Sequence, residues 1–189
     1  MFDLPLPPTP VLETRRLILR PVREDDAPAI QRQFADWEVV RYLSVLVPWP
    51  YPDDGAAAYV ARCLDDHARA VKFHWGVTRK GGDEVIGVID LWPFDGEKRT
   101  MRGFWLARAF WGQGLMTEAA ERVTAYAFED LGWPFLYFSN AAVNHGSHRV
   151  KEKQGAELID TSTGSYVSGE LSKETWCLTR EAWNARRPG

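Results

Sequence analysis

The chain has 189 residues, enough for one domain with a sizeable core, and its 45% hydrophobic and 26% charged residues indicate a globular protein rather than a disordered one. The formal net charge is −3, so the excess of lysine and arginine that marks a nucleic-acid surface is absent. No apolar run approaches the ~20 residues that cross a bilayer, and the start of the chain lacks a secretory signal pattern, so we expect a cytoplasmic protein with no nucleic-acid or membrane partner.

Cysteine and histidine usage argues against a metal site. Cys63 and Cys177 are the only cysteines, they form no CxxC pair, and the four histidines lack metal-ligand spacing. We therefore expect two reduced thiols and no bound metal.

The N-terminal half predicts a leader followed by a strand and several helices. Prolines between residues 5 and 10 predict an extended leader outside the core, so we assign residues 1–11 to a leader and residues 12–185 to a single domain. The predicted elements, in chain order, are a strand at 16–22, a helix at 23–36, a helical segment to about 43, a loop at 47–54 and a helix at 55–69 with an apolar face of Ala57, Val60, Ala61 and Leu64.

The loop at 47–54 carries two aromatic side chains on a stiff backbone. Its three alternating prolines forbid regular structure, so Trp49 and Tyr51 are expected at the surface. Asp53 or Asp54 is expected to cap the helix that follows.

The C-terminal half predicts an antiparallel meander followed by alternating helices and strands. The meander strands are closely spaced, at 72–78, 84–92 and 101–107. A helix at 115–131, a strand at 135–139, a short helix at 147–154 and strands at 157–161 and 174–179 complete the order. This order predicts an α/β architecture on a mixed sheet.

Two glycines mark the most informative turn, which lies between the third meander strand and the following helix. Gly112 and Gly114 allow backbone amides to face one point, and the helix that begins near Leu115 presents its positive end there. The arrangement suits an anionic phosphate group, although a tight connection alone would also explain it. A dinucleotide fingerprint would need a third glycine at Thr117, and no phosphate-binding G-x-x-x-x-G-K-[ST] motif occurs.

Several motifs in this order resemble a known family. Trp111-Gly-Gln-Gly-Leu-Met-Thr-Glu-Ala119 follows one strand, and Asn144-His-Gly-Ser147 and Glu152-Lys-Gln-Gly155 follow the next. With Leu12 to Pro21 at one end and Leu178 to Trp183 at the other, the chain resembles the GNAT acetyltransferase superfamily, and more narrowly its RimJ/RimL-like branch, named for enzymes that acetylate N-termini of ribosomal proteins.

The resemblance implies a fold and a reaction. The expected GNAT fold is a mixed, mostly antiparallel twisted sheet of about seven strands flanked by about four helices. The expected reaction is direct attack of a primary amine on acetyl-CoA, which serves as the co-substrate. The strand around residues 105–107 should splay from the strand at 135–139, with Gly103 as the site of a bulge that allows it.

The resemblance also implies a set of site residues. Ser147 is the candidate that protonates the departing thiolate, and Lys151 and Lys153 are assigned either to the coenzyme A phosphates or to a solvated helix face. The expected cofactor-binding residues are Trp105, Leu106, Ala107, Trp111, Gly112, Gln113, Gly114, Leu115, Met116, Thr117, Asn144 and Ser147.

The acceptor side departs from the family pattern. Many relatives carry a glutamate base two residues before Gly103, where this chain has Met101. An α-amine, with a pKa near ~8, needs a base less than a lysine side chain with a pKa of about 10.4, so the sequence favours low-pKa acceptors. His74 is expected to be a satisfied core residue and Glu118 to brace its helix, and the candidates for acceptor contact are Trp49, Tyr51, His145 and Glu174.

Three functional readings stay open. The first is acetylation of a protein or peptide N-terminus, and the second is acetylation of a small amine such as an amino acid, polyamine or drug. The third is a catalytically inactive, coenzyme A-binding regulatory domain, which Met101 favours and Asn144 and Ser147 disfavour. The sequence is compatible with a monomer or a homodimer.

Overall fold

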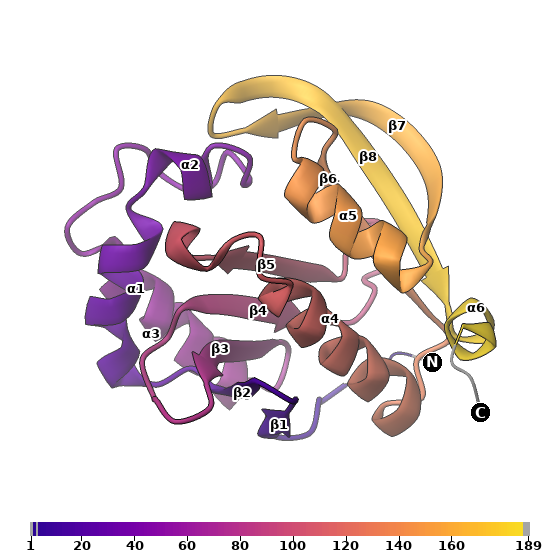
Figure 1. Cartoon of the computed structure of the whole chain (residues 1–189), viewed down its shortest axis with the longest axis horizontal. Helices are drawn as coiled ribbons and strands as arrows, with labels where there is room; N and C mark the ends of the chain where they lie inside the picture. The colour runs from indigo at the N-terminus through magenta and orange to yellow at the C-terminus, as the bar shows by residue number, and fades with distance from the viewer. Residues whose placement is uncertain (1, 3, 187–189) are drawn as a thin grey trace.

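The computed structural model describes residue 2 and residues 4–186, so Met1 and Asp3 of the predicted leader lie outside the described residues. The fold is built from two antiparallel sheets and six α-helices (Figure 1). The elements are β1 (Leu12–Glu13), β2 (Leu17–Pro21), α1 (Ala27–Phe34), α2 (Trp37–Val40), α3 (Gly55–Ala68), β3 (Phe73–Arg79), β4 (Gly87–Leu91), β5 (Arg102–Leu106), α4 (Leu115–Ala125), β6 (Phe135–Ala141), α5 (His145–Gln154), β7 (Glu157–Tyr166), β8 (Gly169–Thr179) and α6 (Arg180–Ala185).

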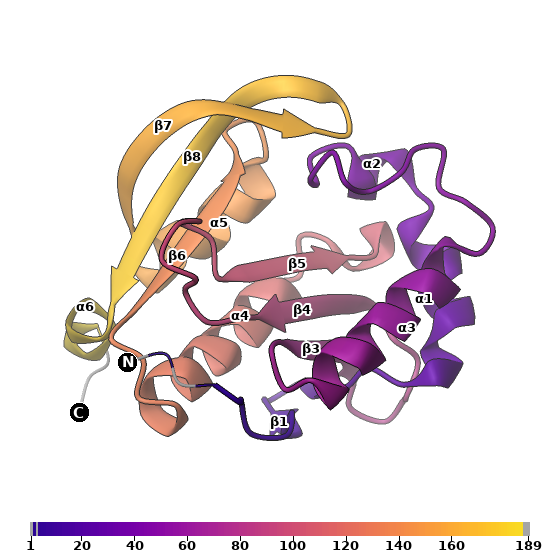
Figure 2. The same ribbon diagram turned by 180° about the vertical axis from the view of Figure 1, so that it is seen from behind.

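The larger sheet has the strand order β1-β2-β3-β4-β5 and is covered on both faces. Helix α4 lies on the face toward the viewer in Figure 1, and α1 and α3 cover the opposite face, as Figure 2 shows. Strand β3 is buried along almost its whole length because both faces are covered. Its Phe73 and Trp75 stack on each other at 5.2 Å and contact Tyr126, directly after α4.

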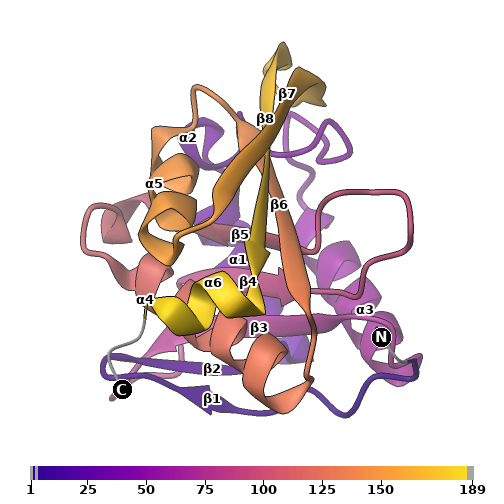
Figure 3. The ribbon, with the colours of Figure 1, turned by 90° about the vertical axis from the view of Figure 1, so that its right-hand side faces the viewer.

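The smaller sheet has the order β6-β8-β7. Strands β7 and β8 form a long hairpin that rises from the body of the molecule and reaches over toward α2 (Figures 1 and 3). The hairpin tip is fastened there, since residue 166 forms a β-bridge with Ser44 and the Val167 amide donates to the Leu43 carbonyl at 3.0 Å. At the other end of the hairpin, α6 packs against the segment after α4, where Trp183 contacts Phe128.

The fold class agrees with the prediction, while the arrangement of strands differs in detail. The expected single mixed sheet of about seven strands is two antiparallel sheets of five and three strands, and six α-helices stand where about four were expected. The sheets are separate because β5 and β6 do not pair along their length. None of the described helices is long and apolar enough to span a membrane.

Two predictions about the N-terminal half are wrong in detail. The buried face of α3 is Ala56, Val60 and Cys63, one position away from the predicted stripe, so Ala57 and Leu64 are exposed. The leader also takes part in the core, because Leu6 is buried in the main hydrophobic cluster.

The predicted cap of α3 is only half right. Asp54 occupies the N-cap position, but its side chain accepts no hydrogen bond from the helix. The Gln31 Oε1 atom accepts from the Ala56 amide at 3.0 Å instead, which ties α1 to α3. At the other end of the chain, Gly155 ends α5 with φ of 74°, as predicted.

Candidate functional site

Strands β5 and β6 meet at one point and then diverge. The Met101 amide donates to the Tyr137 carbonyl at 2.8 Å, and beyond that contact the two strands belong to different sheets. Arg102 lies at this junction, with its guanidinium carbon 3.9 Å from the centroid of the Phe138 ring. The predicted divergence is confirmed, and we call the region between the two strands from this junction outward the splay.

The expected bulge at Gly103 is wrong. The β4–β5 ladder runs without interruption, with Asp90 opposite Gly103 and Gly87 opposite Leu106. The strands diverge because β6 pairs with β8 instead of β5. A Cβ at Gly103 would lie 3.6 Å from the Trp92 ring, which is an ordinary van der Waals contact, so packing does not require a glycine there.

The glycine turn has the backbone that the sequence predicts. Gly112 and Gly114 have φ of 74° and 73°, in the left-handed region that favours glycine. Gly114 is the N-cap of α4 and provides no side-chain cap, so the first amides of the helix are available to an anion. Leu115 and Met116 are buried, so they can contribute only main-chain N–H groups to such a site.

A brace from the start of the chain holds this turn in place. The Glu118 carboxylate accepts hydrogen bonds from Thr14 Oγ1 at 2.6 Å, from the Arg16 amide at 2.8 Å and from Arg16 Nε at 2.6 Å. Arg16 Nη1 also donates to the Gln113 carbonyl at 3.0 Å, inside the turn. Burial alone would raise the pKa of Glu118, but the hydrogen bonds from Thr14 and Arg16 lower it. The predicted bracing role of Glu118 is therefore confirmed.

The outer edge of β5 faces the splay. The Ala107 amide donates to the Ile86 carbonyl on the β4 side at 2.8 Å, so by the alternation of an antiparallel ladder the main-chain groups of Phe104 and Leu106 point away from β4. The Leu106 carbonyl accepts a hydrogen bond from Trp111 Nε1 at 2.7 Å, which folds the turn back onto the strand. Trp105 and Ala107 are buried, so the edge offers mainly backbone.

Helix α5 places the predicted serine beside the splay. The Asn144 side-chain oxygen caps the helix by accepting from the Ser147 amide at 3.1 Å. Ser147 is half-buried, and its Oγ atom accepts a hydrogen bond from Lys151 Nζ at 2.7 Å. Lys151 is only 2% exposed, so it lies on no solvated face, whereas Lys153 is exposed.

Glu174 lies on β8, paired with Asn140 of β6, and is largely buried. Its Oε2 atom accepts from Asn140 Nδ2 at 2.8 Å and lies 2.9 Å from His148 Nδ1. Burial alone would raise the pKa of Glu174, but these hydrogen bonds lower it, so the carboxylate stays ionised. His145, by contrast, is exposed at the first position of α5.

Aromatic side chains connect β5 to the proline-rich loop. The Trp105 ring contacts Phe34 at 5.1 Å, and Phe34 contacts Tyr51 at 4.9 Å, each edge to face. Trp49 is 41% exposed and packs against Trp37 at 5.4 Å. Tyr51 thus lies on the α1 side of the sheet, opposite α4, while Trp49 packs against α2.

The position of the usual base is occupied by a buried apolar side chain. Met101 has no exposed surface, and its sulfur accepts from the Tyr137 amide at 3.4 Å. The carboxylate that β4 supplies is Asp90, which is half-buried and lies 2.9 Å from His74 Nδ1 and 3.3 Å from Lys72 Nζ. Burial would raise the pKa of Asp90, but Lys72 and His74 lower it to about 2, so it cannot act as a general base near neutral pH.

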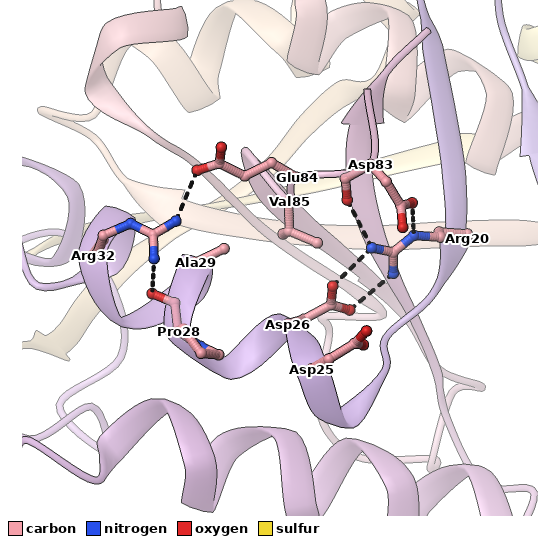
Figure 4. Close-up of a pocket in the computed structure, with 9 residues that line it drawn as sticks. All are labelled: Arg20, Asp25, Asp26, Pro28, Ala29, Arg32, Asp83, Glu84 and Val85. Atoms are coloured by element: carbon pink, nitrogen blue, oxygen red, sulfur yellow. Dashed lines mark hydrogen bonds and ion pairs between the residues drawn. The ribbon is translucent and has the colours of Figure 1, made fainter. Parts of the chain in front are cut away.

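A separate cavity of about 340 Å³ lies beside the start of α1 (Figure 4). Arg20 spans it, pairing with Asp26 and Asp83 at 2.7 Å each, and Arg32 pairs with Glu84 at 3.1 Å. Its lining, as far as the chain is described, includes none of the predicted site residues. These ion pairs tie β2 to α1 and to the turn before β4, which is a structural role.

The described residues hold no group of three or more His, Cys, Asp or Glu that could bind a metal ion. Both cysteines are free thiols. Sequence reasoning missed the burial of the cations Arg102 and Lys151, because it depends on contacts from elsewhere in the chain. Arg102, for example, donates to Thr124 of α4 and lies over the Phe138 ring of β6.

Comparison with known proteins agrees with this geometry. Residues 16–157 match the family described as an acetyltransferase (GNAT) domain. The chain is 29% identical over 147 residues to the uncharacterized N-acetyltransferase YoaA of Bacillus subtilis, an alignment that spans 77% of this chain and 82% of that protein. It is 31% identical over 124 residues to the uncharacterized N-acetyltransferase p20 of Bacillus licheniformis, spanning 64% and 67% of the two chains.

Among solved structures, the chain is similar to RimL, described as a ribosomal L7/L12 alpha-N-protein acetyltransferase in complex with coenzyme A. The TM-score is 0.76 at 16% identity, covering 92% of this chain and 98% of that one. At this identity the likeness shows the fold.

Proposed function

Because the chain belongs to the GNAT acetyltransferase family and is an N-acetyltransferase, we propose that it transfers the acetyl group of acetyl-CoA to the α-amine of a protein or peptide N-terminus. The proposal has two parts, a donor site at the glycine turn and the splay, and an acceptor site beside the aromatic side chains of the proline-rich loop.

The residues at the glycine turn fit the pyrophosphate of coenzyme A. The uncapped start of α4 supplies amides, and a Cβ at Gly112 would meet nothing within 4 Å, so the approach to the backbone is open. Phe104 and the amide of Leu106 offer main-chain groups along β5 for the pantetheine arm, while the Leu106 carbonyl already accepts from Trp111. Gln113, Thr117 and the capping residue Asn144 complete the proposed donor site.

Met101 carries the preference for an α-amine. The residue has neither an ionisable group nor solvent access, and the carboxylate of Asp90 is held ionised by its cationic neighbours. Near pH 7.5, roughly a quarter of an α-amine with a pKa near 8 is already neutral, against about one lysine side chain in a thousand. An acceptor that loses its proton in solution needs no strong base on the enzyme.

The likeness to RimL supports the same acceptor class, since that protein is described as an alpha-N-protein acetyltransferase. Trp49, which packs against α2, and Tyr51, which packs against α1, are the side chains we expect to contact the acceptor. Glu174 contacts His148, the residue that follows Ser147 on α5. It is the carboxylate that we expect to face the acceptor ammonium before the ammonium loses its proton.

The test measures coenzyme A release with matched acceptors. Calorimetry first establishes whether acetyl-CoA binds, and thiol release is then followed with a peptide that has a free α-amine and an acetylated lysine, and with its counterpart that has a blocked N-terminus and a free lysine. A panel of amino acids and polyamines runs in parallel. We expect faster release with the free α-amine.

Each other outcome rejects part of the proposal. Preference for the lysine peptide rejects the argument from Met101, and turnover with polyamines alone rejects the peptide acceptor. Binding of acetyl-CoA without release for any acceptor would favour a regulatory domain, and failure to bind acetyl-CoA rejects the donor site.

A further inference from the structure

Lys151 is a buried lysine on the face of α5 that looks toward β5. It is 2% exposed, and its amine lies 5.7 Å from the centroid of the Phe104 ring. Removing an ammonium group from water is costly unless it is well partnered, so lysine is among the residues least often buried. A buried lysine beside a proposed reaction centre is therefore a candidate for proton transfer.

Within the described part of the chain, both hydrogen bonds of the Lys151 amine go to the predicted serine. Lys151 Nζ donates to Ser147 Oγ at 2.7 Å and to the Ser147 carbonyl at 3.3 Å, one helical turn away. Ser147 as a whole is half-buried, and its hydroxyl has the lysine as a neighbour. The serine hydroxyl therefore connects this amine to a molecule bound in the splay.

The charges around Lys151 favour easy loss of a proton. Burial lowers the pKa of Lys151 well below its usual value, and the Arg102 guanidinium on β5 lowers it further. Glu174 on β8 acts in the opposite direction, and it is itself held by His148 on α5. On α4, Glu121 acts on Arg102. The balance produces a lysine that is a stronger acid than one at the surface.

We propose that Lys151 is a positioning residue that orients the Ser147 hydroxyl and supplies the proton which this hydroxyl passes to the departing thiolate of coenzyme A. This inference rests on the proposed function, since it requires acetyl-CoA in the splay. In this proposal Ser147 contacts the sulfur of coenzyme A, and Lys151 acts only through Ser147.

The proton balance is complete without another reactant. Attack by the neutral acceptor amine forms the C–N bond, and breaking the C–S bond leaves an electron pair on sulfur. The Ser147 proton moves to sulfur while a Lys151 proton moves to the serine oxygen, leaving a neutral lysine. The acceptor nitrogen releases its surplus proton to water, and Lys151 regains a proton from water through Ser147.

The test uses the full chain and needs no knowledge of the acceptor. The pKa of the thiol of bound coenzyme A is measured from the ultraviolet absorbance of the thiolate as the pH is raised, for the wild type and for Lys151→Met, Ser147→Ala and the double variant. Arg149→Met is the control, because it removes an exposed positive charge from the same helix. Methionine keeps the length of the lysine and suits burial, and Ser147→Ala probes the same pair if Lys151→Met does not fold.

We expect Lys151→Met to raise the pKa of the bound thiol by about one unit, because the Ser147 hydroxyl loses the donor that orients it toward the thiolate. Arg149→Met should leave that pKa unchanged, and Lys151→Met should add little once Ser147 is already alanine. With an acceptor in hand, kcat for Lys151→Met should fall about 10²-fold with an unchanged KM for acetyl-CoA.

Two results would overturn the inference while the proposed function stands. One is tight binding of coenzyme A with the same thiol pKa in the wild type and in Lys151→Met. The other is an acetyl group found by mass spectrometry on Ser147 after incubation with acetyl-CoA, which would make the serine a nucleophile. If the wild type fails to bind coenzyme A at all, the proposed function fails first.

Discussion

Arg16 Nε lies 2.6 Å from the Glu118 carboxylate, and this pair joins the turn before β2 to the helix that starts at the glycine turn. Glu118→Ala should lower the free energy of unfolding by about 1–2 kcal/mol, because three donors lose their acceptor in a partly exposed site. Affinity for acetyl-CoA should fall about three- to tenfold as Arg16 loosens its hold on Gln113. Urea unfolding and calorimetry measure the two effects.

The control for this variant is Asp65→Ala. Asp65 pairs with Arg69 at 3.4 Å on an exposed face of α3, so its loss should change the free energy of unfolding by less than about 0.5 kcal/mol. Equal losses in the two variants would show that the Arg16–Glu118 pair is no more than a surface ion pair.

Gly114→Ala separates backbone strain from ligand binding. Gly114 has φ of 73° and Gly96, in a turn away from the site, has φ of 92°, so alanine at either position should cost about 1 kcal/mol of stability. Only Gly114→Ala should also weaken acetyl-CoA binding, because it disturbs the amides that we assign to the pyrophosphate. A Gly114→Ala protein that binds acetyl-CoA as tightly as Gly96→Ala would contradict that assignment.

His74 gives the fold a dependence on high pH. Burial alone would lower the pKa of His74, but Asp90, in contact with its Nδ1 atom, raises it to about 10. The folded pKa lies above the unfolded value of about 6.5, so the stabilisation is complete below that value and is lost as the pH rises through 10.

The corresponding experiment compares the wild type with His74→Gln, which cannot titrate. The stability advantage of the wild type should shrink by about 4 kcal/mol between pH 6 and pH 10, as measured by urea unfolding. Lysines and tyrosines away from this cluster titrate equally in both proteins, so the difference reports His74 together with its neighbours Lys72 and Tyr59. Parallel pH profiles for the two proteins would mean that the imidazole is not held charged between Asp66 and Asp90.

Trp49→Ala tests the acceptor side. Trp49 is partly exposed and rests on Trp37, so removing the indole should raise KM for an acceptor peptide about tenfold. KM for acetyl-CoA should stay within about twofold of the wild type. Leu46→Ala, at a side chain that is 86% exposed on the same loop, is the matched control and should change neither constant.

The glycine turn could be predicted because the necessary information is local. Glycine is the residue type that most readily adopts a positive φ, and both Gly112 and Gly114 do so. The α3 stripe was misplaced because an alanine-rich helix offers more than one apolar face, and only the contact with α1 selects Ala56 and Cys63. A local hydrophobic pattern does not show which apolar face of the helix will pack against another element.

The burial of Lys151, unlike the glycine turn, could not be predicted from the sequence. In sequence Lys151 stands in a polar helix, where every pattern predicts an exposed side chain. Its burial depends on β5 and β8 arriving from elsewhere in the chain and bringing Arg102 and Glu174 with them. The splay itself followed from family resemblance, but its cause, the pairing of β6 with β8, is visible only in the assembled sheets.

The tip of the β7–β8 hairpin is hydrogen-bonded to a segment that is far from it in sequence. Residues 41–45 and 165–168 share main-chain hydrogen bonds, among them Val45 to Ser165 at 3.3 Å and Ser168 to Arg41 at 3.0 Å. If either segment unfolds locally, the other loses its hydrogen-bond partners. The two segments should therefore open as one cooperative unit in amide hydrogen exchange. A molecule that binds under the hairpin and contacts only one of these segments would then slow amide exchange in both.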